Sequence, residues 1–200
     1  MLNVKNAEMA DLEQIMKIYR YAQDYMIKSG NPTQWGHFYP DADLIKSDID
    51  KNACKVIYDK DGIHGVFALF DGTEPTYEHI EGGNWLNEEP YLTIHRLAGD
   101  GQVHGLFPCA LNYCKKISLN IRVDTHADNK TMQRLIEKNG FIKCGTIYVK
   151  NGTARIAYQR TDFRAARFAS ISLNTTRSAA RSVSSSVDRH LDNWQEIVER

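Results

Sequence analysis

The chain has 200 residues, 42% of them hydrophobic and 25% charged, and its 25 basic side chains balance 25 acidic ones. This length suffices for one complete hydrophobic core and is short for two, so we expect one domain with an extension. A balanced charge provides no overall field to attract nucleic acid or a membrane surface, and we expect neither as a partner. No apolar run approaches membrane-spanning length and no leader pattern opens the chain, so we expect a cytoplasmic location.

The cysteines predict neither a disulfide framework nor a metal site. They lie in apolar stretches without Cys-x-x-Cys spacing, so we expect reduced thiols in the core. His64 and His104 have no neighbours in the sequence that would complete a metal site, so no metal is predicted. The cysteines are Cys54, Cys109, Cys114 and Cys144.

The first part of the chain predicts two helices followed by an antiparallel pair of strands. Apolar residues recur at helical spacing until Gly30, and a second amphipathic pattern follows an aromatic loop at 34–40. Two β-rich runs flank the turn residues Asp-Lys-Asp-Gly at 59–62, a hairpin signal. The expected elements are a strand at 2–5, helices at 11–28 and 41–51, and strands at 54–58 and 63–70.

The second part begins with a segment, 72–90, whose glycines, prolines and acidic residues predict a surface excursion. A strand, a glycine-bearing turn and a helix follow it. Asp128 or Asn129 can cap a later helix that Gly140 ends, and Asn151-Gly152 predicts a closing hairpin. The expected elements are strands at 91–98, 121–123, 141–149 and 154–160, and helices at 104–116 and from about 129 to 139.

From Thr161 the composition shifts to Ser, Arg and Ala, so we divide the chain into a domain at 1–160 and a tail at 161–200. The end of the tail has apolar residues on one helical face. A terminal amphipathic helix that docks on the domain or on a second subunit, as in a homodimer, is one interpretation, and a frayed extension is the other. A third is that the arginines of the tail bind an anionic partner. The apolar residues are Val187, Leu191, Trp194 and Val198, and the arginines are Arg164, Arg167, Arg177 and Arg181.

The turn at 99–107 is the most informative stretch of the sequence. Free amides at the start of a helix, together with the helix dipole, can bind a pyrophosphate, and Gly99, Gly101 and Gly105 allow a ligand to approach the backbone. Glycine turns before helices are common, however, and a plain structural turn is the alternative.

Two segments resemble the GNAT N-acetyltransferase superfamily. Residues 102–107, Gln-Val-His-Gly-Leu-Phe, are similar to its acetyl-CoA signature, Gln/Arg-x-x-Gly-x-Gly/Ala. Asn129 and the run Glu-Lys-Asn-Gly-Phe at 137–141 resemble its next helix. The resemblance covers about 2–160 and implies an α/β fold, a mixed sheet of about seven strands with helices on both faces.

The resemblance further implies an enzyme that moves acetyl from acetyl-CoA to a primary amine of a small molecule or peptide, by direct attack in a ternary complex. The strand before the turn would pair with the pantetheine arm, the turn would bind the pyrophosphate through its amides, and Asn129 would contact the arm or simply cap its helix. The implied contact residues are Leu97, Ala98, Gly99, Gln102, Val103, His104, Gly105, Leu106, Phe107 and Asn129.

The sequence departs from the family pattern at two positions. Phe107 replaces the final Gly/Ala of the signature, so its side chain must point away from the cofactor. Ile136 stands where the family often has a tyrosine that serves as general acid. An acyl-CoA-binding module without turnover is therefore the alternative function.

Acetyl transfer needs a neutral amine, and deprotonating a lysine-like amine of pKa near 10.4 at neutral pH costs about 4 to 5 kcal/mol. His95 is the first candidate for the base, since strand alternation would place it on the same side as Leu97 and Gly99. A histidine hydrogen-bonded within the sheet is the alternative.

Other candidates for the site come from later strands and from the aromatic loop. Tyr148 is the candidate for the missing acid, and His126 could take either role. Simple packing of the tyrosine and solvent exposure of the histidine are the alternatives. Trp35, Phe38 and Tyr39 either line the acceptor pocket or anchor their loop.

Overall fold

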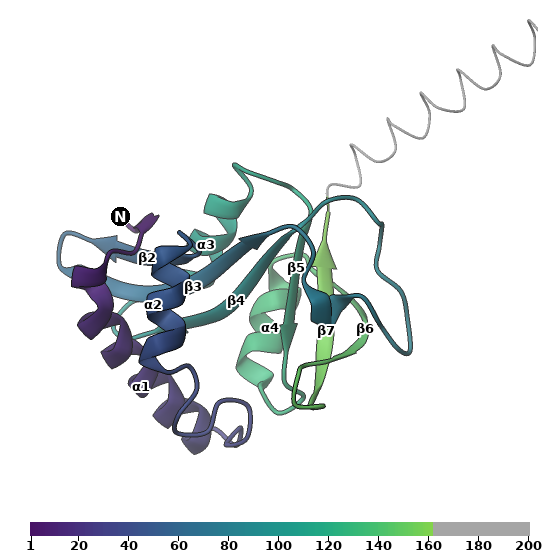
Figure 1. Cartoon of the computed structure of the whole chain (residues 1–200), viewed down its shortest axis with the longest axis horizontal. Coiled ribbons are helices and arrows are strands. Elements are labelled where there is room, and N and C mark those ends of the chain that lie inside the picture. The colour runs from purple at the N-terminus through teal and green to yellow at the C-terminus, as the bar shows by residue number, and fades with distance from the viewer. Residues whose placement is uncertain (162–200) are drawn as a thin grey trace, which may run out of the picture. The chain divides into compact units, whose positions relative to one another are not determined.

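In a computed structural model, residues 1–161 are described, and the predicted terminal helix and the arginines of the tail lie outside them. The described part of the chain contains seven strands, four α-helices and two short 3-10 turns (Figure 1). The strands are β1 (Asn3–Asn6), β2 (Cys54–Asp59), β3 (Gly62–Asp71), β4 (Leu92–Gly99), β5 (Ile121–Thr125), β6 (Ile142–Tyr148) and β7 (Ala154–Arg160). The helices are α1 (Leu12–Lys28), α2 (Ala42–Asp50), α3 (Leu106–Cys114) and α4 (Lys130–Lys138), and the 3-10 turns are η1 (Met9–Asp11) and η2 (Pro75–Tyr77).

The strands form one mixed sheet in the order β1-β2-β3-β4-β5-β7-β6. Every pair is antiparallel except β4 and β5, which are parallel and are matched only at Leu92–Ile121 and Thr93–Arg122. Beyond these two positions the strands separate, and Figure 1 shows them spreading apart from their common end. The predicted α/β fold with a seven-stranded mixed sheet is confirmed, and the break in its hydrogen bonding lies beside the glycine turn.

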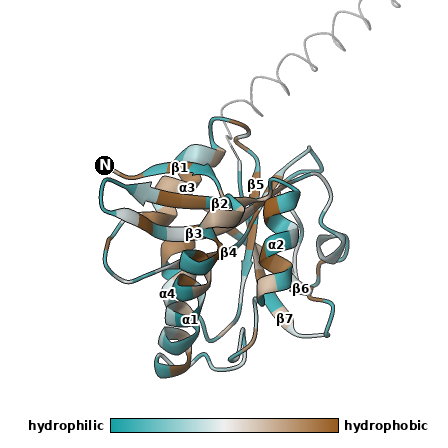
Figure 2. Cartoon of the chain, turned by 60° about the vertical axis from the view of Figure 1, so that its left-hand side comes forward, coloured by the Kyte–Doolittle hydropathy of each residue, from teal (hydrophilic) through white to brown (hydrophobic). Residues whose placement is uncertain are grey.

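Helices cover both faces of the sheet, as predicted. On one face α3 and α4 pack on a core that includes Phe67 and Ile94, and on the other face α1 and α2 pack on a core that includes Val56 and Val66. In Figure 2 hydrophobic residues run along the central strands, whereas the helices mix hydrophobic and hydrophilic residues, as one buried face requires. Within 1–161 no helix is long and apolar enough to cross a membrane.

A β-bulge in β4 interrupts the alternation of its side chains. Val66 pairs with Ala98 and Ala68 with His95, so two β4 residues oppose one residue of β3. Arg96 has a positive φ of 54°, which is unusual for a residue with a side chain. Its conformation is held by two contacts: Nη2 lies 2.5 Å from Oδ2 of Asp48 on α2, and its carbonyl oxygen accepts a hydrogen bond of 3.1 Å from the Tyr19 hydroxyl.

The bulge also changes which residues share a face. Leu97 packs with Ile94 in the core under α3 and α4, although strict alternation would put them on opposite faces. The Cα of Gly99 faces the same side, because a side chain there would meet Leu106 of α3. His95 lies against Tyr77 and Asp124 instead. The prediction that His95 shares a face with Leu97 and Gly99 is therefore wrong, because the extra residue reverses the alternation.

Arg122 is one of several residues of the sheet that contact the excursion at 72–90. The Arg122 guanidinium of β5 lies between the rings of Trp85 and Tyr91, at 4.0 and 3.8 Å from their centroids. Its Nη2 donates to the carbonyl of Asn87 at 2.8 Å. The hydroxyl of Tyr91 in turn accepts from the amide of Glu74 at 3.1 Å, which places Glu74 near the sheet.

The Arg96–Asp48 pair makes a testable contribution to stability. Asp48→Asn preserves the shape of the side chain but leaves a buried guanidinium without its counterion, so we expect the free energy of unfolding in urea to fall by about 3 kcal/mol. Asp43→Asn on the same helix is the matched control, because the Asp43 side chain is 91% exposed and its ion pair with Lys46 contributes less than about 1 kcal/mol. Equal losses in the two variants would contradict this account.

Candidate functional site

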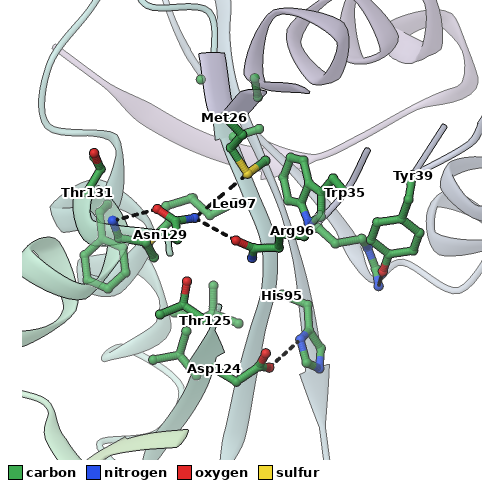
Figure 3. A pocket seen from close by; sticks show the side chains of 18 of the residues that line it. Met26, Trp35, Tyr39, His95, Arg96, Leu97, Asp124, Thr125, Asn129 and Thr131 are labelled. Atoms are coloured by element: carbon green, nitrogen blue, oxygen red, sulfur yellow. Dashed lines mark hydrogen bonds and ion pairs between the residues drawn. The ribbon is translucent and has the colours of Figure 1, made fainter. Parts of the chain in front are cut away.

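A cavity of about 1100 Å³ opens where β4 and β5 separate. The end of β4, the glycine turn and the start of α3 form one wall, and the end of β5 with the start of α4 forms the other. Side chains of α1 and of the aromatic loop line it as well, Trp35 and Tyr39 among them (Figure 3). Phe38 is 87% exposed and is not among the lining residues, so only two of the three predicted aromatic residues reach the cavity.

The glycine turn presents a row of free amides. Within 1–161 the N–H groups of residues 103–107 donate to no backbone or side-chain acceptor, and Pro108 has no N–H. Gly105 caps α3 with a φ of 85°, and a side chain added there would meet no atom within 4 Å. These amides and the helix dipole form an anion-binding cradle that is open to a ligand.

Most of the predicted cofactor residues line the cavity. The exception is Gln102, which is not a lining residue and whose amide donates to Oδ1 of Asp100 at 2.9 Å. Phe107 is buried, and its ring packs against Phe141 with the centroids 6.0 Å apart, so the side chain points into the core as the signature requires. The predicted residues that line the cavity are Leu97, Ala98, Gly99, Val103, His104, Gly105, Leu106, Phe107 and Asn129.

A buried histidine holds the beginning of the turn. Nδ1 of His64 lies 2.9 Å from Asp100, and Nε2 lies 3.0 Å from Asp59. Both nitrogens can donate only when the imidazole is protonated, and the hydrogen bond with Asp100 is the main cause that raises the pKa of His64. The amide of Asp100 also donates to the His64 carbonyl at 3.0 Å. The β2–β3 hairpin thereby fixes the residue that precedes the cradle.

Asn129 connects the start of α4 with the aromatic loop that also lines the cavity. Its Oδ1 caps α4 by accepting from the amide of Met132 at 3.0 Å, and its Nδ2 donates to Oε1 of Gln34 at 3.0 Å. Figure 3 shows Asn129 reaching toward Met26 of α1. Asn129 therefore caps α4 as predicted, and it also lines the cavity where β4 and β5 separate.

Midway along β4, four residues before Gly99, His95 lies between two carboxylates. Nε2 is 3.3 Å from Oε2 of Glu74, and Nδ1 is 3.6 Å from Oδ1 of Asp124. Figure 3 marks the ion pair between His95 and Asp124. The hydrogen bond with His95 lowers the pKa of Glu74 to about 2, so this carboxylate is charged. The Tyr77 hydroxyl donates to Oδ1 of Asp124 at 2.7 Å and fixes its position. The arrangement suits proton transfer from a cationic amine.

The structure does not bring the other predicted catalytic residues to the cavity. Tyr148 is exposed on the edge strand β6, where its hydroxyl donates to Glu81 at 2.9 Å. His126 lies in the turn before α4, and its Nδ1 accepts from the amide of Asp128. Neither residue lines the cavity. Ile136 is fully buried, so α4 supplies no acid at that position.

Three residues of the site were missed from the sequence. Asp124 had a detectable signal, because it lies near the carboxyl end of β5, which is parallel to β4, and the carboxyl ends of neighbouring parallel strands meet at one edge. Glu74 lies in an excursion without periodicity and Arg155 in an ordinary hairpin strand, so neither carried such a signal. No group of three His, Cys, Asp or Glu side chains in the described residues could hold a metal ion.

Comparisons with solved structures identify proteins of the same fold. A GNAT-family acetyltransferase from Streptococcus agalactiae 2603 is 29% identical, with a TM-score of 0.71 over 80% of this chain and 95% of that one. A putative acetyltransferase from Staphylococcus aureus Mu50 is 27% identical, with a TM-score of 0.58 over 79% of this chain and 97% of that one. A putative acetyltransferase from Salmonella typhimurium, solved with its cofactor acetyl-CoA, has a TM-score of 0.52 over 81% and 95% and, at 14% identity, shows likeness of fold alone. No family model and no curated protein sequence matches the chain.

The raised pKa of His64 predicts a pH-dependent contribution to stability. A pKa raised in the folded state gives stability that is complete below the ordinary value of 6.5 and is lost as the pH rises through the folded value. We therefore expect His64→Gln to lower the free energy of unfolding most below pH 6.5 and progressively less at alkaline pH. His79→Gln is the control, since that side chain is 78% exposed. Urea unfolding across this range is the measurement, and a difference from wild type that stays constant with pH would refute the charged bridge.

Proposed function

We propose that this chain, which belongs by its fold to the GNAT N-acetyltransferase superfamily, transfers acetyl from acetyl-CoA to a primary amine of a small molecule or peptide. The observation that carries the proposal is one cavity with a row of free amides at one end and a histidine between carboxylates at the other. The first end suits a pyrophosphate and the second suits an amine. All of these residues lie within 1–160, which we propose as the catalytic domain.

The length of β4 between the two ends fits an extended cosubstrate. His95 precedes Gly99 by four residues, about 13 Å at roughly 3.3 Å per residue. Beyond Thr93 this edge of β4 has no partner in β5, so its backbone is free to pair with the amides of a pantetheine arm. The phosphates would then lie at the cradle and the thioester near His95.

The hydrogen bond with Glu74 orients His95 as a base. In the proposed tautomer Nε2–H donates to Glu74, which leaves the lone pair of Nδ1 on the side of Asp124. The substrate ammonium gives a proton to Nδ1, and the neutral nitrogen attacks the thioester carbonyl carbon. The new C–N bond forms, the C–S bond breaks, and coenzyme A leaves as a thiolate with the bonding electron pair. The second proton lost from the nitrogen passes to water or to the thiolate.

Ile136, in place of the usual tyrosine, supports the alternative of an acyl-CoA-binding module without turnover. The energetic effect of that substitution is small, however. A thiol has a pKa of about 8.5, so protonating the thiolate at pH 7 contributes only about 2 kcal/mol. We therefore favour the enzyme. Calorimetry with acetyl-CoA, combined with thiol release across a panel of amines, separates the two functions, since binding without turnover on any amine would favour the module.

The cradle can be tested by adding charge at one position. Gly105 has a positive φ and open space beside it, and Asn and Asp both tolerate this backbone conformation. We expect Gly105→Asp to raise the Kd for acetyl-CoA more than about tenfold relative to Gly105→Asn, because its carboxylate repels the pyrophosphate. Isothermal titration calorimetry measures both. Equal affinities would mean that the phosphates bind elsewhere.

The base can be tested without disturbing the cradle. We expect His95→Asn to lower kcat about 100-fold or more, because general base catalysis contributes on that order, while the Kd for acetyl-CoA stays within twofold. Glu74→Gln should lower kcat less, since the imidazole remains but its orientation is weaker. Tyr148→Phe is the control. We expect it to leave kcat unchanged, because this tyrosine does not line the cavity. An unchanged kcat in His95→Asn would remove the assignment.

A further inference from the structure

We infer that the acceptor is an α-amino acid, whose free carboxylate is bound by Arg155 while its amine lies at His95. This inference rests on the proposed transferase activity and adds the class of acceptor. Its central observation is a buried cation that lines the cavity at the amine end and has few partners in the described part of the chain.

Arg155 lies on β7 and is only 8% exposed, yet it belongs to the cavity wall. Within 1–161 its guanidinium makes a single hydrogen bond, from Nη1 to the carbonyl of Ala154 at 3.3 Å. Nε lies 3.9 Å from Oδ2 of Asp124, which is beyond hydrogen-bond length. A guanidinium has five N–H donors, so most of its capacity is unused.

Asp124 is the counterion of Arg155 through the ion pair at 3.9 Å, and the N–H donors that it leaves unused can donate to an anion in the cavity. Burial lowers the pKa of Arg155, although a guanidinium stays protonated in proteins. Its planar fork matches a carboxylate, which it can bind with two parallel hydrogen bonds. The cavity beside Arg155 therefore suits a carboxylate on the ligand.

The distance between the two functions sets the size of the acceptor. Asp124 separates them, with Oδ1 facing Nδ1 of His95 at 3.6 Å and Oδ2 facing Nε of Arg155 at 3.9 Å. One carboxylate spans the gap between the base and the guanidinium. Because both groups contact the same carboxylate, an amine at His95 and an anion at Arg155 would lie close together, as in a molecule that carries both on the same or adjacent carbons.

The cosubstrate does not account for Arg155. Its phosphates have their own donors in residues 103–107, at the far end of β4, and its thioester carries no negative charge in the ground state. Glu74 and Asp124 supply the opposite charge for the ammonium group of the acceptor. The amine end of the cavity thus has partners for both charges of a zwitterion.

The test compares each of the standard α-amino acids with its α-carboxamide as acceptor for wild-type protein and acetyl-CoA. The acid and the carboxamide have nearly the same size. They differ in the charge of the group that faces Arg155 and in the pKa of the amine, so the two are compared at equal concentrations of the neutral amine. We expect kcat/KM to be about 10- to 100-fold higher for the acid in the best pair, since a hydrogen bond to a charged group contributes about 1.5 to 3 kcal/mol. The difference should appear mainly in KM.

A variant assigns this preference to Arg155. Arg155→Met keeps a long side chain without charge, and we expect the ratio of acid to carboxamide to fall toward 1. Arg155→Lys keeps the positive charge but loses the planar guanidinium, and we expect it to retain part of the preference for the acid over the carboxamide. An unchanged Kd for acetyl-CoA shows that each variant is folded.

The outcomes separate the inference from the proposed function. Equal kcat/KM for acid and carboxamide in wild type would overturn the inference and leave the proposed transferase activity unaffected. Because this comparison uses wild-type protein, it tests the inference even if Arg155→Met does not fold. An equal fall for both acceptors in Arg155→Met would assign the residue to the reaction or the fold instead of to a carboxylate. Transfer to no amine at all, despite bound acetyl-CoA, would overturn the proposed function together with the inference.

Discussion

The site depends on the separation of β4 and β5, and the bulge at Arg96 accompanies it in β4. Two adjacent parallel strands would normally remain hydrogen-bonded along their length, but here the pairing ends at Thr93 and Arg122. Asp48 and Tyr19 hold Arg96 in a left-handed conformation that its side chain would otherwise disfavour. The helices of one face thereby stabilise an irregular strand, and that strand leaves free backbone groups beside a cavity.

The cavity has opposite electrostatic character at its two ends. Partial positive charges of the amides at 103–107 gather where α3 begins, and full negative charges gather around His95. The two ends are connected through the backbone of β4, so the strand that carries His95 also leads to the cradle. Such polarity orients a molecule that has phosphates at one end and meets a cationic amine at the other.

Local features of the sequence predicted the local structure. Glycines at 99, 101 and 105, the cap at Asn129 and the turn at Asn151-Gly152 each depend on a few neighbouring residues, and each lies where it was expected. The charged cluster depends on something else. Glu74, His95, Asp124 and Arg155 lie on segments that meet through strand order and through long-range contacts of the excursion, such as the hydrogen bond from Tyr77 to Asp124. Strand alternation also predicted the wrong face for His95, because no residue type in β4 indicates that the strand contains a bulge.

An α-amino acid would also reduce the difficulty of deprotonation. The carboxylate of a free amino acid stabilises its own ammonium group and so raises the pKa of the amine. Arg155 offsets that effect by pairing with the carboxylate, which moves the amine toward the value of about 8 for a peptide α-amine instead of 10.4 for lysine. The energy needed at pH 7 then falls from about 4.6 to about 1.4 kcal/mol. After transfer, the imidazolium of His95 lies beside Glu74 and Asp124, so the positive charge has counterions both before and after the proton moves.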